Sequence, residues 1–232
     1  MTKKIRVVVL EDYQLTLDGY AARLGKSPDV ELVGMASFGE DLEPMLVEHP
    51  ADVVILDVNV PTSPDNANPY PIMHVIPRLL QMYPKMAVLA ISMLTERSLI
   101  KAVMEAGANG YILKDDNAAI RELPAIVQSV AGGGIYLSQK AHQELFRRRT
   151  REQQPLLTPR QQQALSICAS YPDCTTEELA EKLGVSNSTV RNLLSGAYLR
   201  LGVRNRAAAI AKAQQMGLIT PMQQMSLAAR AK

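Results

Sequence analysis

Five short apolar runs, separated by longer amphipathic stretches, dominate the first half of the chain. They are rich in Val, Ile and Leu, and they cover Ile5–Leu10, Val30–Met35, Val53–Leu56, Ala87–Ile91 and Gly110–Leu113. The stretches between them are long enough for helices, for example Leu15–Leu24 and Glu96–Ala106. Continuous apolar strands that alternate with helices are typical of a parallel sheet covered on both faces. We therefore predict an α/β domain built from five βα units.

The second half has a helical pattern throughout. Thr158 precedes a proline at the start of "LTPRQQQALSICAS", "TTEELAEKLG" begins with a T-x-x-E capping pattern and ends at Gly184, and "SNSTVRNLLSGAYLRLG" ends at Gly202. The short turn "GVSNS" joins the last two helices. This order predicts a helix-turn-helix, whose second helix enters the DNA major groove. A four-helix bundle without a nucleic-acid role is the alternative.

The charge of the two halves differs in sign. Residues 1–132 carry 11 basic and 17 acidic residues, a net charge of −6, whereas residues 133–232 carry 14 and 6, a net charge of +8. A basic half beside an acidic one favours double-stranded DNA as a partner of the second half over the bundle alternative.

Length and glycine content suggest where the domains meet. A chain of 232 residues, 47% apolar, suits one domain of ordinary size and a smaller one. The glycines of "AGGGIYLSQ" and the basic "FRRRTR" favour a tether between them. We expect an α/β domain at 1–132, a linker with a short helix at 133–155, a helix-turn-helix domain at 156–219 and a tail at 220–232.

The remaining composition excludes several protein classes. No apolar run approaches the roughly 18 residues that cross a bilayer, and "MTKK" is not followed by a cleavable apolar region, so we expect no membrane partner and a cytoplasmic location. Cys168 and Cys174 form no C-x-x-C pair, and no histidine cluster accompanies them. Neither a disulfide framework nor a zinc site is therefore expected.

Polar residues follow four of the predicted strands where each strand ends. Glu11 and Asp12 follow the first, Asp57 and Ser92 end the third and fourth, and Lys114 follows the fifth. The carboxyl ends of parallel strands meet at one edge, where such folds place their sites. Three carboxylates close together repel one another unless a cation lies among them, and oxygen ligands suit Mg²⁺. Taken singly, each residue has an ordinary explanation as a helix cap or a surface charge.

These residues together resemble the receiver domain of two-component response regulators. The resemblance implies a flavodoxin-like, five-stranded parallel sheet of order 2-1-3-4-5, with Asp57 as the acceptor of a phosphoryl group from a sensor histidine kinase. Lys114 would pair with that group and the hydroxyl of Ser92 would donate a hydrogen bond to it. The resemblance also implies the ligands of Mg²⁺: Glu11, Asp12, Asp57 and the main-chain carbonyl of Asn59.

Tyr111 lies at the position where this family has an aromatic side chain that changes rotamer on phosphorylation. The alternative is a half-buried strand aromatic without a switching role.

Two departures from the family leave open whether phosphorylation is altered or lost. The stretch "PTSPDNANPYPIMHVIP" is long, lacks the usual glycine and contains five prolines, so the third helix must begin late or be largely replaced. Met93 stands where a small residue is usual.

The second half resembles the LuxR-type output domain of the NarL/FixJ group. The resemblance runs from "LLTPRQQQALSICAS" to "AIAKAQQMGLI", and together the two resemblances cover nearly the whole chain. Two details differ from the family: Gln161 replaces the glutamate of its T-x-R-E opening, and its TVKNH-like segment is "TVRNL". Because output domains of this family pair, a homodimer is implied.

A helical period of about 100° per residue divides the second helix of the predicted helix-turn-helix into two faces. The inward face consists of Val190, Leu193, Leu194, Ala197, Tyr198 and Leu201. The outward face consists of Arg191, Asn192, Ser195, Gly196 and Leu199. On the outward face, Arg191 suits guanine, Asn192 suits adenine, and Ser195 suits a base or a phosphate.

Three arginines at the end of this helix are expected to contact phosphates: Arg200, Arg204 and Arg206. Gly196 is costly inside a helix, by about 1 kcal/mol relative to alanine. It either allows the backbone to approach DNA closely or is a neutral change.

We infer a response-regulator transcription factor that is not an enzyme and binds DNA as a dimer once Asp57 is phosphorylated. A DNA-binding regulator that works without phosphorylation is the alternative. An aspartyl-phosphate hydrolase is a third class, but its chemistry needs a second acid two residues after the nucleophile, and Asn59 cannot serve. The cognate kinase, the target genes and the sign of regulation are not encoded in these patterns.

Overall fold

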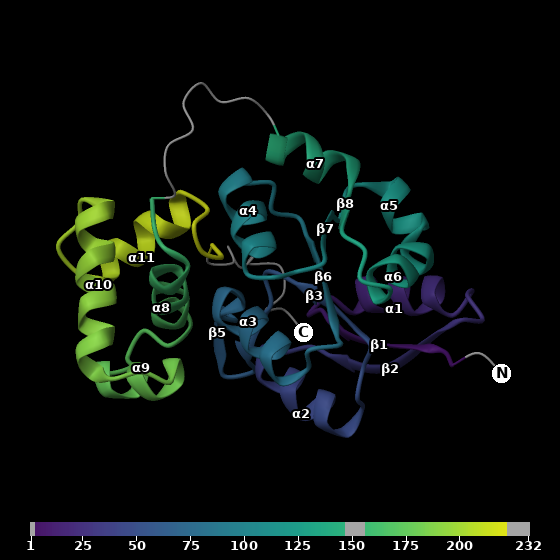
Figure 1. The fold of residues 1–232 in the computed structure, drawn as a ribbon, viewed down its shortest axis with the longest axis horizontal. Coiled ribbons are helices and arrows are strands. Elements are labelled where there is room, and N and C mark those ends of the chain that lie inside the picture. Colours follow the sequence, from purple (N-terminus) through teal and green to yellow (C-terminus); the bar gives the residue numbers. More distant parts are fainter. Residues whose placement is uncertain (1–2, 147–155, 222–232) are drawn as a thin grey trace, which may run out of the picture.

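The predicted apolar strands form the centre of an α/β unit (residues 3–146), and a helical unit (residues 156–221) lies beside it (Figure 1). The computed structural model describes these two ranges of the chain. All five predicted strands are present with their ends within one residue of the expected positions. The late start of the third helix is also confirmed, because that helix begins only at Ile72.

The elements of the α/β unit are, in chain order, β1 (Ile5–Leu10), α1 (Gln14–Leu24), β2 (Val30–Ala36), the 3₁₀ helix η1 (Gly39–Asp41), α2 (Leu42–Glu48), β3 (Val53–Asp57), β4 (Pro61–Ser63), β5 (Asn66–Pro69), α3 (Ile72–Met82), β6 (Ala87–Ser92), α4 (Arg97–Glu105), β7 (Gly110–Leu113), α5 (Asn117–Arg121), α6 (Leu123–Ala131), β8 (Tyr136–Leu137) and α7 (Gln139–Phe146).

The main sheet is parallel and has the order β2-β1-β3-β6-β7-β8. Its first five strands follow the predicted order 2-1-3-4-5. The sixth, β8, was not predicted; it has two residues, with Tyr136 beside Gly110 and Leu137 beside Tyr111. Helix α7 follows β8 and packs against α4 and β7. The first part of the expected linker is thus built into the sheet, while residues 147–155 lie outside the described residues.

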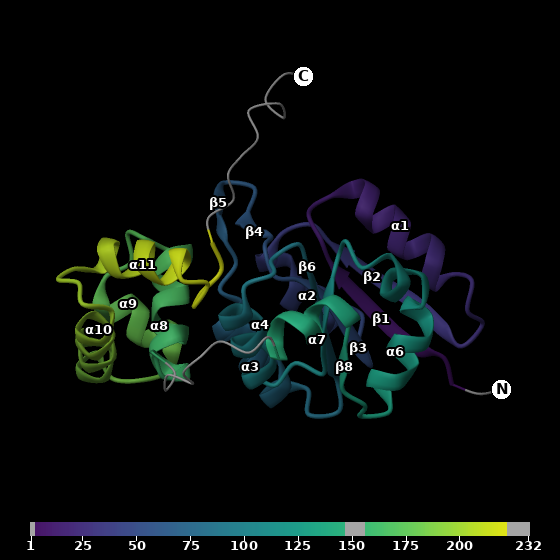
Figure 2. The ribbon, with the colours of Figure 1, turned by 90° about the horizontal axis from the view of Figure 1, so that it is seen from above.

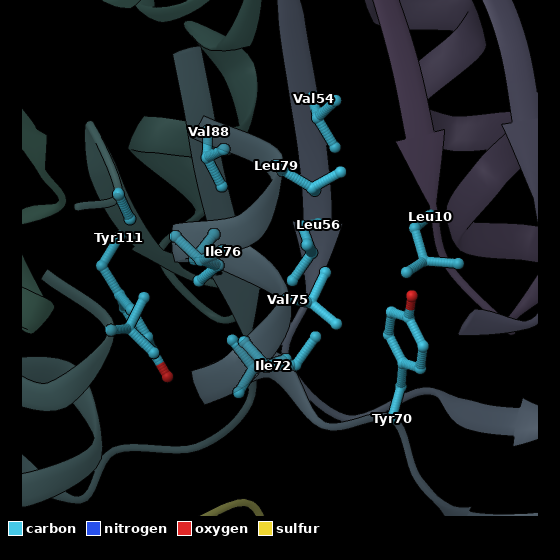
Figure 3. Packing of buried hydrophobic residues seen from close by; sticks show 14 of the residues in the cluster. Leu10, Val54, Leu56, Tyr70, Ile72, Val75, Ile76, Leu79, Val88 and Tyr111 are labelled. Carbon is cyan, nitrogen blue, oxygen red and sulfur yellow. The ribbon is translucent and has the colours of Figure 1, made fainter. Parts of the chain in front are cut away.

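Alternate residues of each central strand supply the two faces of the sheet. On one face, Leu10, Leu56 and Val88 pack against Ile76 and other residues of α3 (Figure 3). On the other face, the neighbouring strand residues pack against α1, α5 and α6. Each fully buried Val, Leu or Ile contributes about 1.5–3 kcal/mol. Because both faces are covered, the carboxyl edge of the sheet is left as the place where polar groups of several strands meet.

The proline-rich stretch after β3 folds into a second, two-stranded antiparallel sheet formed by β4 and β5. We call residues 61–69 the hairpin. The hydroxyl of Thr62 donates to the carbonyl of Asn68 at 2.8 Å, and the side-chain oxygen of Asn66 accepts from the Asn68 amide at 3.1 Å. These bonds satisfy main-chain groups that a proline-rich chain cannot pair regularly. The hairpin therefore occupies the long stretch between β3 and α3 and accounts for the late start of α3.

The helical unit consists of α8 (Pro159–Ser170), α9 (Thr176–Leu183), α10 (Asn187–Leu201) and α11 (Arg206–Gln215). Capping boxes begin α8 and α9, at Thr158 with Gln161 and at Thr175 with Glu178. Gly184 and Gly202 end α9 and α10 in the left-handed conformation, with φ of 63° and 66°. The predicted helix-turn-helix is confirmed as α9, its turn and α10. Within the described residues, no helix has both the length and the apolarity to span a bilayer.

The left-handed φ of Gly184 gives a stability prediction. An added Cβ at Gly184 meets no atom within 4 Å, so Gly184→Ala tests conformational strain alone. We expect it to destabilise the helical unit by about 1–2 kcal/mol, measured by calorimetry. Gly19→Ala is the matched control, since it also meets no atom but lies inside α1; it should stabilise the α/β unit by about 0.5–1 kcal/mol. Effects of the same sign at both sites would contradict the assignment.

Candidate functional site

The carboxyl edge of the main sheet brings together charged and polar groups from four strand ends. Asp57 and Ser92 are the last residues of β3 and β6, whereas Glu11 and Lys114 directly follow β1 and β7. The ammonium of Lys114 lies 2.6 Å from a carboxylate oxygen of Glu11 and 2.8 Å from one of Asp57. Glu11, Asp12 and Asp57 each offer a carboxylate oxygen, and these atoms lie within 4.8 Å of one another. We call Glu11, Asp12, Asp57, Ser92 and Lys114 together the acidic pocket.

Burial controls the electrostatics of the acidic pocket. Glu11 is 1% exposed and Asp57 is 5% exposed. Desolvation, together with the charge of Asp57, raises the pKa of Glu11 to about 7. Desolvation also raises the pKa of Asp57, against the opposing effect of Lys114. Burial alone would lower the pKa of Lys114, but the two carboxylates outweigh it and raise that pKa. The pocket therefore holds one ammonium group, that of Lys114, which stays protonated, beside three carboxyl groups.

Main-chain amides fix the two buried carboxylates. The amide of Tyr13 donates to Glu11 at 3.1 Å, and the amide of Asn59 donates to Asp57 at 3.1 Å. Each carboxylate thus uses one oxygen for the turn after its strand and the other for Lys114. The donor set consists of hard oxygens, which fits Mg²⁺ better than a softer metal. The residues present therefore suit the predicted ion.

Ser92 and Tyr111 both bind the main chain of Leu94, in the loop that leaves β6. The hydroxyl of Ser92 accepts from the Leu94 amide at 3.1 Å, and the hydroxyl of Tyr111 donates to the Leu94 carbonyl at 2.8 Å. Tyr111 is 0% exposed and joins the cluster on the α3 side of the sheet (Figure 3). It is thus fully buried rather than half-buried, and burial raises the pKa of its phenol. Its role as a switch stays a prediction.

Met93 lies at the surface, directly after a residue of the acidic pocket. It is 62% exposed, whereas Ser92 before it is fully buried. Whether Met93 affects access to Asp57 stays an open prediction.

Helix α10 presents the predicted DNA-facing residues on its solvent side. Arg191, Asn192 and Ser195 are exposed, and Leu199 beside them is 83% exposed. The core of the helical unit takes up the other face; Val190, Leu194, Ala197 and Leu201 are buried, and Leu193 and Tyr198 pack against them. The predicted division of the helix is therefore observed for every position except Gly196.

The three arginines expected at phosphates lie in different surroundings. Arg200 and Arg204 are exposed. Arg206 is the first residue of α11, and its guanidinium donates to the carbonyl of Cys174. The structure thus holds Arg206 within the helical unit, whereas Arg200 and Arg204 face solvent. Phosphate contact stays a prediction for all three.

Comparison with known proteins agrees with this geometry. The family described as "Response regulator receiver domain" matches residues 7–127, which is more than half of the chain, and "Sigma-70, region 4" matches residues 156–201. The chain belongs to the response-regulator family. The first match contains the acidic pocket, and the second contains the helix-turn-helix of this regulator.

Several relatives match over nearly their full length. The transcriptional regulatory protein MctR of Rhizobium johnstonii is 28% identical over 94% of this chain and 96% of its own. The probable transcriptional regulatory protein NarL of Mycobacterium tuberculosis is 29% identical over 94% and 97%. DegU of Brevibacillus brevis is 26% identical over 93% and 95%. The regulator is thus similar to NarL- and DegU-type proteins across both units.

Solved structures share the two-unit fold. RcsB from Salmonella enterica serovar Typhimurium, bound to promoter rprA in the presence of the phosphomimetic BeF3−, has a TM-score of 0.60 and 20% identity, with 90% of this chain and 98% of that chain covered. Another RcsB structure, from Salmonella typhimurium, has a TM-score of 0.56 and 21% identity, with 90% and 97% covered. At this identity the likeness shows the fold.

Gly196 of the regulator lies against α8. A Cβ at this position would be 2.6 Å from the side-chain nitrogen of Gln161, the residue that closes the capping box with Thr158. The helix angle alone had placed Gly196 on the outward face, but the position is only partly exposed because the start of α8 approaches it. Gln161, which differs from the family's glutamate, and Gly196 therefore meet in space.

Sequence reasoning missed two features of the acidic pocket. It paired Lys114 with an incoming phosphoryl group but not with Glu11, to which Lys114 is bound at 2.6 Å. It also missed Leu94, whose main chain receives both Ser92 and Tyr111. Leu94 acts through its backbone, so its side chain carries no signal of this role. The convergence of strand ends could have revealed the Glu11 contact.

The contact of Gly196 with Gln161 predicts that the effect of one substitution depends on the other. Gly196→Ala should stabilise the helical unit by less than the roughly 1 kcal/mol that alanine has over glycine in a helix, because the new methyl displaces the end of the Gln161 side chain and disturbs the capping box. In a Gln161→Ala background the same change should give the full gain, because the side chain that is displaced is absent. Calorimetry of the four variants measures the coupling. Equal effects in both backgrounds would show that the two residues do not interact.

Proposed function

We propose that this regulator accepts a phosphoryl group on Asp57 from a partner sensor histidine kinase, with Mg²⁺ held in the acidic pocket, and binds double-stranded DNA as a homodimer through α10. The single observation that carries the proposal is the position of Asp57. It is a buried carboxylate, bound to Lys114 at 2.8 Å, with two further carboxylates beside it. Such a group can act as a nucleophile toward phosphorus when nearby cations neutralise the phosphoryl oxygens.

Each residue of the acidic pocket has a role that its position supports. One oxygen of Asp57 accepts from Asn59, which orients the carboxylate, and the other contacts Lys114. Lys114 can exchange this contact for a phosphoryl oxygen while it keeps Glu11 as a partner. The hydroxyl of Ser92, at the end of the neighbouring strand, can donate to a second phosphoryl oxygen. Contacts to the phosphoryl group would thus replace the contact with Lys114 that Asp57 gives up.

The predicted metal ligands are Glu11, Asp12, Asp57 and the main-chain carbonyl of Asn59. Bound Mg²⁺ supplies neutralisation of phosphoryl charge. The protein contributes the oxygen donors, and burial, followed by the charge of Asp57, raises the pKa of Glu11 among them.

The alternative function is DNA binding that does not depend on phosphorylation. The position of Tyr111 favours it, since this side chain is already buried and bound to Leu94 without a phosphoryl group at Asp57. In that case Tyr111 would not need to change its rotamer to support DNA binding. Measuring DNA affinity with and without a phosphodonor separates the two functions.

Asp57→Asn should abolish phosphorylation. Incubation of the wild type with a small phosphodonor and Mg²⁺ should add one phosphoryl group by intact mass, labile to base as acyl phosphates are. The variant should add none, because an amide is not a nucleophile of this kind. Asp29→Asn, at an exposed carboxylate outside the acidic pocket, is the control and should be labelled like the wild type. Equal labelling of Asp57→Asn would refute the acceptor, and an unlabelled wild type would support the alternative function.

Arg191→Ala and Arg204→Ala should weaken DNA binding in different ways. Arg191 lies on the exposed face of α10, where a bidentate contact to guanine discriminates by about 1–3 kcal/mol, so its loss should erase the preference at one position of each half-site. Arg204 follows α10, so its loss should weaken binding to all sequences and reduce the salt slope by about one. Selection from a random DNA pool and titrations at several salt concentrations measure both effects.

The control and the symmetry of the selected site complete this test. Lys26→Ala, at an exposed position of the α/β unit, should leave sequence preference and affinity unchanged. A dimer should select two half-sites related by a two-fold axis and about one helical turn apart or less. If Arg191→Ala selects the wild-type sequence with undiminished preference, α10 does not contact bases in the proposed way.

A further inference from the structure

Helix α8 is enclosed on all sides, although a small helical unit needs to bury only one face of it. Every residue from Gln161 to Ser170 is buried, including three glutamines and two serines. One side packs on α9, α10 and α11, and the other lies against α3 and β5 of the α/β unit (Figures 1 and 2). Of its polar residues, Gln162 and Gln163 line a pocket with α3 and α4, and Ser170 bonds to Pro69, so these three lie in a contact between the two units.

The hairpin supplies hydrogen bonds to the last turn of α8. The side-chain amide of Asn66 donates to the carbonyl of Ser170 at 2.9 Å, and the hydroxyl of Ser170 donates to the carbonyl of Pro69. The last carbonyls of a helix have no partner within the helix. Asn66 satisfies one of them, so the hairpin caps a helix of the other unit.

The end of α11 makes a second attachment, close to the acidic pocket. The hydroxyl of Ser98, in α4, donates to the carbonyl of Met216 at 2.7 Å. The hydroxyl of Thr220 lies 3.4 Å from the carbonyl of Val58, the residue directly after Asp57. Gly217 has a φ of 62°, and a Cβ there would approach Glu96 to 2.7 Å. Position 217 therefore requires glycine both for its positive φ and for the close approach of Glu96.

The edge of the contact is polar. The hydroxyl of Tyr171 donates to Glu40 at 3.1 Å, and the ammonium of Lys182 lies 4.0 Å from the centre of the Tyr171 ring. Arg78 and Glu43 form an ion pair beside them. These residues line a pocket of about 260 Å³ between the two units. A close-packed centre with a polar edge is the usual composition of a specific but separable contact.

The DNA-facing side of α10 takes no part in this contact. Arg191, Asn192, Ser195 and Leu199 are exposed with both units in place. In Figures 1 and 2, α10 lies on the side of the helical unit that points away from the main sheet. The contact of the two units therefore leaves the predicted DNA-binding residues uncovered.

We propose that α3 and the hairpin form a docking surface for α8 of the same chain, and that the regulator binds DNA while its two units remain docked. This inference rests on the proposed DNA binding by α10. It assigns to the hairpin the function of carrying the helical unit in a DNA-competent orientation. DNA binding then needs no separation of the units.

A chemical cross-link that holds the units docked tests the proposal. We would introduce Ser98→Cys and Met216→Cys in the full chain, replace the partly exposed Cys174 by serine, and join the new thiols with a short bis-maleimide. Native Cys168 is buried, and burial raises the pKa of its thiol to about 11, so it should not react. The probe is the DNA duplex selected from the random pool by the wild type.

We expect the cross-linked chain to bind this duplex within about twofold of the same variant before cross-linking. A loss of tenfold or more on cross-linking would overturn the proposal, because α10 would then have to move away from the α/β unit. Arg191→Ala in the cross-linked chain should still lose sequence preference, which shows that binding uses α10. Failure of the wild type to select any duplex from the pool would instead refute the proposed function and the inference with it.

A second measurement tests the docking surface without DNA. Spin labels at Val47→Cys and Gln215→Cys, both exposed, report the distance between the units in the Cys174→Ser background. The distribution should be narrow in that chain and broad after Asn66→Arg or Ser98→Arg, which place a bulky charge in either attachment. Asp65→Arg, at the exposed tip of the hairpin, is the matched control and should keep the narrow distribution. Equally narrow distributions in all variants would contradict the docking role of these residues.

Discussion

One ammonium group held between two buried carboxylates is the interaction on which the acidic pocket depends. Lys114 leaves β7 and binds Glu11 after β1 and Asp57 at the end of β3, so it joins strand ends that are not all neighbours in the sheet. Removing it would leave buried carboxylates without a partner, a change that is strongly destabilising. The excess of carboxylates over ammonium that remains is what makes the pocket suited to a further cation.

The same chain segment links this pocket to the contact with the helical unit. After Asp57 the chain enters the hairpin within four residues, and the amide of Tyr70 closes the hairpin on the carbonyl of Val60 at 2.9 Å. Val58 lies between the two sites and faces Thr220. Displacement of residues 58–60 would thus act on both the pocket and the docked helical unit. The long loop after Asp57 therefore connects the acidic pocket directly to the helical unit.

The central sheet and the separate strand-end residues were predictable, because continuous apolar runs of four to six residues that alternate with helices admit few other folds. The two-residue β8 was not, since such a strand has no period and depends on the free edge of β7. For the hairpin, only the late start of the third helix was predicted, because the hairpin's bonds run between Asn and Thr side chains and the main chain. The place of Gly196 was missed because a helix angle contains no information about Gln161 on another helix.

The composition of α8 explains how the contact between the units can be specific although each of its bonds is weak. Its receiver-facing surface carries glutamine and serine, which remain compatible with water, and the attachments described above are single hydrogen bonds worth about 0.5–1.5 kcal/mol each. Bonds of this size would not hold two separate proteins together, but the two units belong to one chain. Tethering raises the effective concentration of α8 at its docking surface, so a few polar bonds suffice. An apolar α8 would dock more tightly, yet it would expose that surface to aggregation whenever the units parted.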